Sequence, residues 1–153
     1  MSGLTIDRTV DVNILMTWRM EVLHCVFSIP EDTDTRGLEQ QNRRYYERHL
    51  ADGTHIACMA HIDGEAVGCG GICLYDEMPS PDNPSGRCAY LMNIYVREPF
   101  RKQGIGQQII RWLVGQAQES GITKIYLETS HVARHLYGSL GFAEMEDMMI
   151  WTR

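Results

Sequence analysis

Apolar residues recur every three or four positions in the first part of the chain, which predicts a helix, and the polar stretch that begins after Pro30 is predicted to form a second. The first follows Asp11, a residue suited to cap a helix, and its apolar positions extend to Phe27, just before Pro30. The second covers residues 35–51 and is mostly polar ("RGLEQQNRRYYERHL"), so we expect it to be exposed or to border a cleft. Alternation of apolar and polar residues over 4–8 predicts a short strand before both helices.

The middle of the chain has the pattern of a hairpin followed by a central strand. The segments "HIACMAHI" and "EAVGCGGICLY" flank Asp63 and Gly64, a dipeptide typical of tight turns between antiparallel strands. Residues 76–86, "DEMPSPDNPSG", hold three of the five prolines and form a long loop, which is a candidate cover for a functional site. The dense apolar run "CAYLMNIYV" then predicts a central strand.

The last third alternates helices and strands. Residues 106–120 are amphipathic and end at Gly121, a typical helix stop. The segment "KIYLE" predicts a strand, "SHVARHLYGSLGF" a short helix ending at Gly141, and "EMEDMMIW" a final strand. The resulting order, βααβββ–α–β–α–β, indicates an α/β (α+β) chain with a mixed sheet. No repeat or linker divides it, so we expect one domain over residues 1–153.

Composition narrows the function classes. The 153 residues carry a net charge of −6, which disfavours nucleic-acid binding. No segment approaches the ~18 consecutive apolar residues of a membrane span, and the N-terminal sequence lacks the pattern of a signal peptide. The five cysteines are odd in number and form no CxxC pair, so we expect reduced thiols and a cytoplasmic protein. His131 and His135 have a spacing seen in zinc sites but no third ligand, and we expect no metal.

The stretch "REPFRKQGIGQQIIRW", residues 97–112, carries the clearest chemical signal. It leads from a strand through basic residues and two glycines into a helix. The first N–H groups of a helix have no intrahelical partners, and the helix dipole makes that end positive, so phosphate is a suitable ligand. A Walker A sequence is absent, and Ile109 stands where a dinucleotide fingerprint has its third glycine. From spacing alone, glycines that merely permit a tight turn remain the alternative.

The segment "RKQGIG" resembles the R/Q-x-x-G-x-G/A signature of the GNAT superfamily of acyl-CoA-dependent N-acyltransferases. Upstream, "YLMNIYVREPF" resembles the family's fourth strand and its exit, and "ARHLYGSLGF" resembles its "A-x-x-L-Y-x-x-L-G-F" segment. The resemblance covers about residues 4–151. It implies the GNAT fold, a mixed central sheet of about six to seven strands flanked by about four helices. A splayed CoA-binding cleft would lie between the fourth and fifth strands.

The resemblance also implies acetyl-CoA as co-substrate, with no metal. Backbone groups of the fourth strand would bind the pantetheine arm, and those of the signature loop the pyrophosphate. These cofactor-binding candidates are Ile94, Tyr95, Val96, Arg101, Lys102, Gln103, Gly104, Ile105, Gly106 and Gln107.

The implied chemistry is direct attack of a neutral amine on the thioester. Tyr137 matches the tyrosine that protonates the departing thiolate in the family, although an aromatic residue there can also simply pack the helix. Some relatives place a glutamate on the fourth strand as general base, but this chain has none there. Glu128, at the end of the next strand, Glu21, on the first helix, and a water chain are the alternatives.

The leading hypothesis is therefore an N-acetyltransferase that moves an acetyl group from acetyl-CoA to a primary amine of a small molecule or peptide. The alternative is a non-catalytic CoA-binding sensor or interaction module on the same fold. His24, Arg36 and Tyr45, on the first two helices, are candidates for acceptor contacts. The acidic net charge suits a basic amine such as a polyamine or aminoglycoside, although local charge decides this. The apolar C-terminal sequence allows a homodimer.

Overall fold

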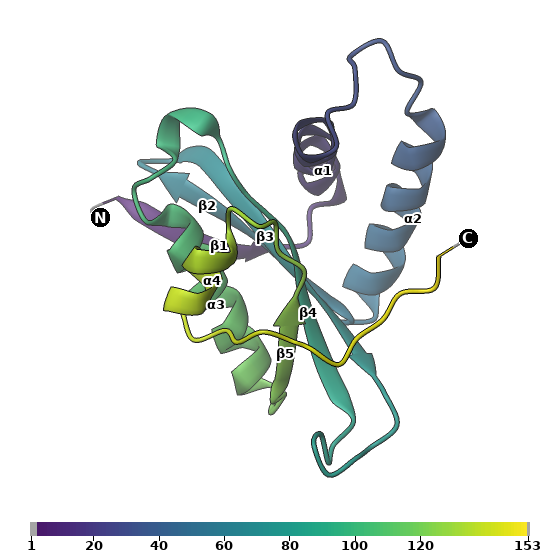
Figure 1. Ribbon diagram of the computed structural model, residues 1–153. Coiled ribbons are helices and arrows are strands. Elements are labelled where there is room, and N and C mark those ends of the chain that lie inside the picture. The colour runs from purple at the N-terminus through teal and green to yellow at the C-terminus, as the bar shows by residue number, and fades with distance from the viewer. Residues whose placement is uncertain (1–2, 153) are drawn as a thin grey trace.

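The computed structural model describes residues 3–152 (Figure 1). Its elements in chain order are β1 (Leu4–Thr9), α1 (Val12–Val26), α2 (Arg36–Ala51), β2 (His55–Ile62), β3 (Glu65–Asp76), β4 (Arg87–Val96), the 3₁₀ turn η1 (Glu98–Phe100), α3 (Ile105–Glu119), β5 (Lys124–Leu127) and α4 (Arg134–Ser139). In this part of the chain no helix has the length and apolar character needed to cross a membrane.

The sheet lies between two layers of helices. Its order is β1-β2-β3-β4-β5, and every pair is antiparallel except β4 with β5, which is parallel. Side chains of α1 and α2 pack with one face of the sheet, and those of α3 and α4 with the other (Figure 1). The mixed sheet expected from the element order is therefore confirmed.

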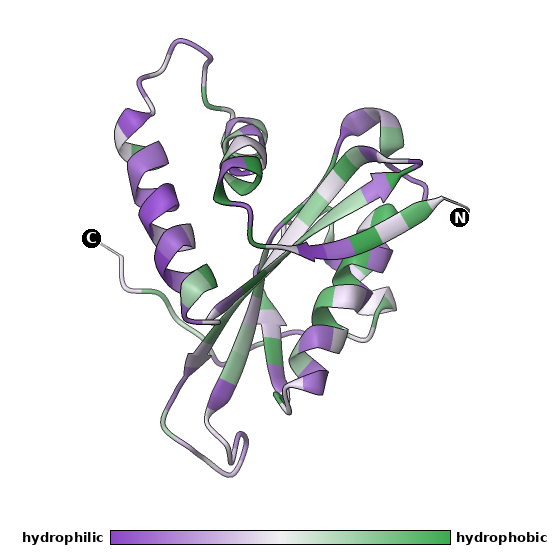
Figure 2. Cartoon of the chain, turned by 180° about the vertical axis from the view of Figure 1, so that it is seen from behind, coloured by the Kyte–Doolittle hydropathy of each residue, from purple (hydrophilic) through white to green (hydrophobic). Residues whose placement is uncertain are grey.

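Local sequence explains how the helices begin and which side they bury. The Asp11 carboxylate accepts hydrogen bonds from the backbone N–H groups of Asn13 and Ile14, at 3.0 and 3.2 Å, and so caps α1 as expected. The apolar stripe of α3, including Ile109 and Leu113, is fully buried against the sheet. By contrast, α2 is mostly hydrophilic in Figure 2, and Tyr46 is its one buried residue among those described.

Glycines in β3 bring both helical layers close to the backbone of the sheet. A Cβ on Gly70 would lie 2.6 Å from a methyl carbon of Ile109, on the α3 side. A Cβ on Gly71 would lie 2.8 Å from Nε2 of His55, on the α2 side. Contacts this short do not occur in real structures, so neither position accepts a side chain unless its neighbour moves.

The strand β4 changes its surroundings halfway along its length. Its pairing with β3 shifts register between Cys69 and Gly71, and within the resulting bulge Asn93 adopts a left-handed backbone with φ of 60°. Pairing with β5 ends at Leu91 and Leu127, so residues 92–96 have a neighbouring strand only on the β3 side. The expected opening between the fourth and fifth strands is therefore present.

Two expectations about the chain's periphery are wrong. The segment 144–151 forms no strand, and the described residues contain five strands instead of six or seven. The side chains of this segment are exposed, with Met149 99% and Trp151 91% accessible. A strand needs a partner for its backbone groups, and β5 offers an edge only four residues long. The loop 76–86 does not cover the site. Glu77 holds it to Lys124, 2.8 Å away at the start of β5, and thus at the end of the sheet opposite to residues 97–106 (Figure 1).

Candidate active site

The glycine-containing loop presents free backbone N–H groups at the start of α3. Gly104 is the N-cap residue with φ of 83°, a conformation that favours glycine, and no side chain caps the helix. The first intrahelical bond joins the N–H of Gln108 to the carbonyl of Gly104 at 3.2 Å. The N–H groups of Ile105, Gly106 and Gln107 therefore precede the helical ladder, and the first turn holds no acidic residue. This end of α3 is suited to an anion such as a phosphate.

Arg101 connects this loop to the open part of β4. Its Nε donates a hydrogen bond to the carbonyl oxygen of Val96 at 2.7 Å, and its guanidinium carbon lies 5.6 Å from the centre of the Tyr95 ring. Arg101, Lys102 and Gln103 are exposed, and Lys102 has a left-handed backbone with φ of 62°. Residues 94–96 of β4 and the loop before α3, which the sequence assigned to one ligand, thus lie side by side.

The side chains of Ile94, Tyr95 and Val96 divide between the two faces of the sheet. Ile94 and Val96 pack with the core on the α3 side, whereas Tyr95 packs with the core on the α1 side, where its ring centre lies 6.3 Å from that of Trp18. On the β5 side, no strand of the described chain pairs with their backbone. An extended ligand can therefore lie along this part of β4 as an additional strand would.

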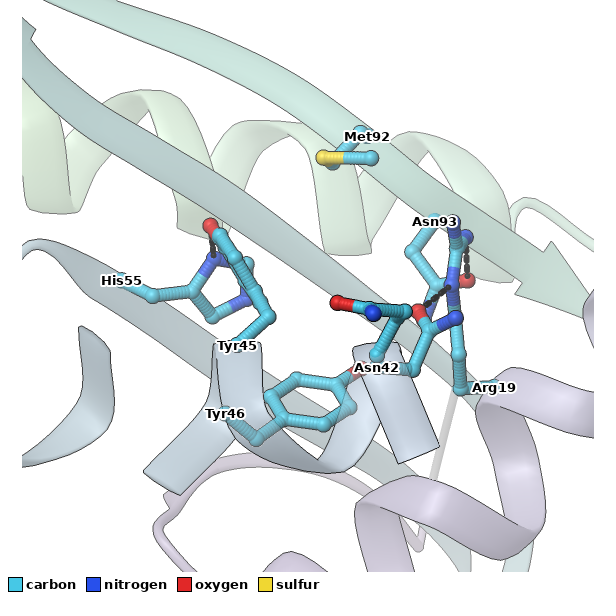
Figure 3. A pocket seen from close by; sticks show the side chains of 8 residues that line it. Arg19, Asn42, Tyr45, Tyr46, His55, Met92 and Asn93 are labelled. Carbon is cyan, nitrogen blue, oxygen red and sulfur yellow. Dashed lines mark hydrogen bonds between the residues drawn. The ribbon is translucent and has the colours of Figure 1, made fainter. Parts of the chain in front are cut away.

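A cavity of about 250 Å³ lies between α1, α2 and the bulge of β4 (Figure 3). Its lining residues are Arg19, Gln41, Asn42, Tyr45, Tyr46, His55, Met92 and Asn93. Arg19 donates from Nε to the side-chain oxygen of Asn42 and from Nη1 to that of Asn93, both at 2.9 Å. One arginine thereby holds both helices against the bulge.

The opposite wall of this cavity holds a neutral histidine. A hydrogen bond of 2.8 Å joins Oη of Tyr45 to Nδ1 of His55, and another of 2.8 Å joins the same hydroxyl to Sγ of Cys73. Burial, followed by electrostatic interactions with His49 and Arg19, lowers the pKa of His55 to about 4. Burial also raises the pKa of Tyr45 far above its usual value of 10. Both side chains are therefore uncharged at neutral pH.

Tyr137 lies on α4, on the α3 side of the sheet. Its ring is half-buried and packs edge-to-face on Phe142, with 5.8 Å between ring centres. Burial raises the pKa of its hydroxyl above the usual value of 10, so the group carries its proton at neutral pH. It therefore has the protonation state required of an acid.

The two candidate bases lie in different surroundings. Glu128 is exposed and follows directly after Leu127, where β5 separates from β4. Burial, together with the nearby Glu128 carboxylate, raises the pKa of Tyr90 to about 12. Glu21 instead accepts two hydrogen bonds from Arg97, at 3.0 and 2.8 Å, which lower the pKa of Glu21. Neither carboxylate lines the cavity at the bulge.

The three residues predicted to contact the acceptor lie in different surroundings. Tyr45 lines the cavity at the bulge. Arg36 is exposed, pairs with Asp34 and lines a separate groove between α1 and α2. His24 lines neither, and its Nδ1 bonds with the carbonyl of Ile29 at 3.0 Å.

We did not predict from the sequence that Arg19, Asn42 and Asn93 lie together. The sequence does mark Asn93, because this polar residue interrupts the apolar run "YLMNIYV". Nothing comparable marks the other two among the many polar residues of the helices. No cluster of three or more potential metal ligands occurs within residues 3–152.

Comparison with known proteins gives a consistent result. The family model described as "Acetyltransferase (GNAT) family" matches residues 18–142. The chain is 27% identical over 133 residues to a thialysine N-epsilon-acetyltransferase of Sus scrofa, covering 68% of this chain and 78% of the relative. It is 28% identical over 122 residues to an aminoglycoside N(6')-acetyltransferase type 1 of Serratia marcescens, covering 76% and 82%.

Among solved structures, the fold is similar to that of a predicted acetyltransferase with acetyl-CoA from Clostridium acetobutylicum. The TM-score is 0.85 at 24% identity, and the alignment covers 97% of this chain and 96% of the other. This similarity extends the agreement in fold beyond the segment that the family model matches.

Proposed function

Because the chain belongs to the GNAT family of acetyltransferases, we propose that it transfers an acetyl group from acetyl-CoA to a primary amine of a small molecule or peptide. Membership makes it an acetyl-CoA-dependent acyltransferase. The observation that carries the finer proposal is that three features follow one another along the chain: the cavity wall at Met92 and Asn93, the unpaired side of residues 94–96, and the uncapped start of α3. Donor and acceptor can then meet at the bulge in one ternary complex.

The donor side of this proposal uses the chain's backbone. The N–H groups of Ile105, Gly106 and Gln107 would hold the pyrophosphate, with Arg101 and Lys102 adding positive charge. Open space surrounds Gly104, where an added Cβ would meet no atom of residues 3–152 within 4 Å, so a ligand can approach the loop closely. Residues 94–96 would bind the pantetheine arm along the side of β4 that lacks a strand.

In the proposed reaction the neutral amine attacks the thioester carbon, a C–N bond forms and the C–S bond breaks. Tyr137 gives its proton to the departing thiolate. The proton lost by the amine goes to Glu128, which follows the point where β4 and β5 separate. We prefer Glu128 to Glu21 because the ion pair with Arg97 lowers the pKa of Glu21 and so makes it a weaker base.

The relatives support a small-molecule amine as acceptor. The names of two of them specify an ε-nitrogen of thialysine and a 6'-nitrogen of an aminoglycoside. Both names describe transfer to nitrogen on a small molecule, and this coarser class is the part that we carry over. The cytoplasmic location and the homodimer also remain predictions, which imaging of a tagged protein and light scattering would test.

The proposal is tested by incubating the protein with acetyl-CoA and a panel of primary amines while free thiol is measured. We expect thiol release that depends on both substrates. Acetyl-CoA alone should raise the melting temperature, because a ligand at a hundredfold excess over its Kd stabilises by ~2.7 kcal/mol. Stabilisation without thiol release for any amine would favour the non-catalytic CoA-binding module instead.

A further inference from the structure

The cavity at the bulge contains a positive charge that has no negative partner among residues 3–152. Arg19 is half-buried, and its Nε and Nη1 donate to neutral amide oxygens of Asn42 and Asn93. The ion pairs within residues 3–152 involve Arg36, Arg97, Lys124 and Arg134, and none of them includes Arg19. A guanidinium removed from water usually acquires a carboxylate or phosphate partner, because its desolvation is costly.

The two asparagines hold the guanidinium in a fixed orientation. Asn42 donates from Nδ2 to the carbonyl of Leu38 at 2.9 Å, which leaves its Oδ1 to accept from Arg19. Asn93 stands in the bulge, whose left-handed backbone directs its side chain to the same arginine. Within the described residues, Nη2 of Arg19 makes no hydrogen bond. A pre-oriented guanidinium with a free N–H group is suited to bind an oxyanion.

Arg19 is the one formally charged residue among the described residues that line this cavity. Besides Arg19, its walls consist of amides, tyrosines, a methionine and His55, whose low pKa keeps it neutral. A second ammonium group on an acceptor would meet a positive charge here and no carboxylate. The negative net charge of the protein therefore does not describe the local field at the place where an acceptor would enter.

Resting on the proposed function, we infer that the acceptor is a small primary amine that also carries an oxyanion, a carboxylate or a phosphate, and that Arg19 binds this oxyanion. Arg19 is then a specificity-determining residue. It selects against polyamines and aminoglycosides, the acceptor types that the overall acidity favours. Its charge also favours the neutral form of an amine bound nearby, which is the nucleophilic form.

The experiment compares matched acceptors. One arm uses 4-aminobutanoate, 5-aminopentanoate and 6-aminohexanoate against their carboxamides, and a second uses O-phosphoethanolamine against ethanolamine. A third arm uses 1,6-diaminohexane. In the unmodified protein we expect at least one oxyanion-bearing amine to exceed its neutral counterpart about tenfold or more in kcat/KM. The first two arms distinguish carboxylate from phosphate. The inference is overturned if the diamine is the better substrate.

Variants then assign the effect to one residue. Arg19→Gln should reduce kcat/KM for the preferred amine by about ten- to hundredfold, the usual effect of losing a charged hydrogen bond, and change the neutral counterpart little. Arg44→Gln, an exposed position on the same helix α2 as Asn42 but outside the cavity, should change neither. An equal loss with both acceptors in Arg19→Gln would mean that Arg19 only supports the bulge, and would refute the inference.

A binding measurement separates this inference from the proposed function. Calorimetric titration of 6-aminohexanoate and O-phosphoethanolamine into CoA-saturated protein should detect binding of one of them. That binding should be at least tenfold weaker in Arg19→Gln and unchanged in Arg44→Gln. Such binding without turnover would contradict the proposed reaction and leave the inference standing. Equal affinity in the Arg19→Gln and unmodified proteins, or no binding of either compound, would contradict the inference.

Discussion

Arg97 and Glu21 form an ion pair with two hydrogen bonds, at 3.0 and 2.8 Å, which joins the end of β4 to α1. Arg97 also lies over Trp18, with its guanidinium carbon 4.1 Å from the ring centre. The side chains of Arg97 and Glu21 are 38% and 33% exposed, so water screens their attraction substantially. Glu21 is therefore better suited to fixing the position of α1 through this pair than to accepting a proton.

The first prediction concerns Glu21→Gln. It should leave kcat within about twofold and reduce the free energy of unfolding at pH 7 by only about 0.5 kcal/mol, the scale of partly exposed ion pairs. Pairing lowers the pKa of Glu21 below 4.5, so its contribution is present above that pH and is lost as pH falls through the lowered value. Chemical denaturation of both proteins should show a smaller difference in their free energies of unfolding at pH 3 than at pH 7. A hundredfold loss of kcat would instead identify Glu21 as the base.

The second prediction concerns the loop before α3. Gly104→Val places a β-branched residue at a φ of 83° and should abolish the rise in melting temperature caused by acetyl-CoA, because the strained loop no longer presents its N–H groups. Gly115→Val is the matched control. Gly115 lies inside α3, has open space around it and lacks a positive φ, so stabilisation by acetyl-CoA should survive. Equal responses in both variants would contradict a binding role for the loop.

The third prediction concerns Tyr137→Phe. Loss of the proton donor should lower kcat by about a hundredfold or more, while the Kd for acetyl-CoA changes less than threefold. Because burial raises the pKa of Tyr137, activity of the unmodified protein should not decline through loss of this proton below pH 10. Tyr75→Phe is a control on the other face of the sheet, where Tyr75 is bonded to Tyr126. Normal turnover in Tyr137→Phe would leave the ring only a packing role.

The fourth prediction concerns Glu128→Gln. If Glu128 accepts the proton of the amine, the variant should lose about a hundredfold in kcat, and the loss should diminish as pH rises and more acceptor is already neutral. Glu119→Gln, an exposed carboxylate at the end of α3, is the control and should behave as the unmodified protein. Unchanged kcat in Glu128→Gln would assign proton removal to water.

Much of the fold follows from local sequence signals. The bounds of β2 agree with the predicted strand, because an apolar run between a turn and the Asp63–Gly64 dipeptide leaves few alternatives. The final strand was mispredicted for the opposite reason. The segment "EMEDMMIW" has the composition of a strand, but backbone pairing depends on a neighbouring edge that local composition does not describe.

The donor and acceptor sides differ in how far sequence determines them. The donor loop is continuous in the chain, so its glycines and basic residues are visible as one motif. The acceptor cavity instead combines Arg19, Asn42 and Asn93 from three separate elements. Only the folded chain shows that these residues meet, and that the positive charge of the cavity is opposite in sign to the net charge of the protein.

The half-paired strand β4 has a consequence for handling the protein. Residues 92–96 present backbone groups without a strand on one side, and such an exposed strand edge is a template for aggregation with other chains. A bound extended ligand would cover this edge, so solubility should rise with acetyl-CoA in the buffer. Amide hydrogens of these residues should likewise exchange more slowly with solvent when the ligand is present. For this chain, the co-substrate would then act as a chemical chaperone as well as an acetyl donor.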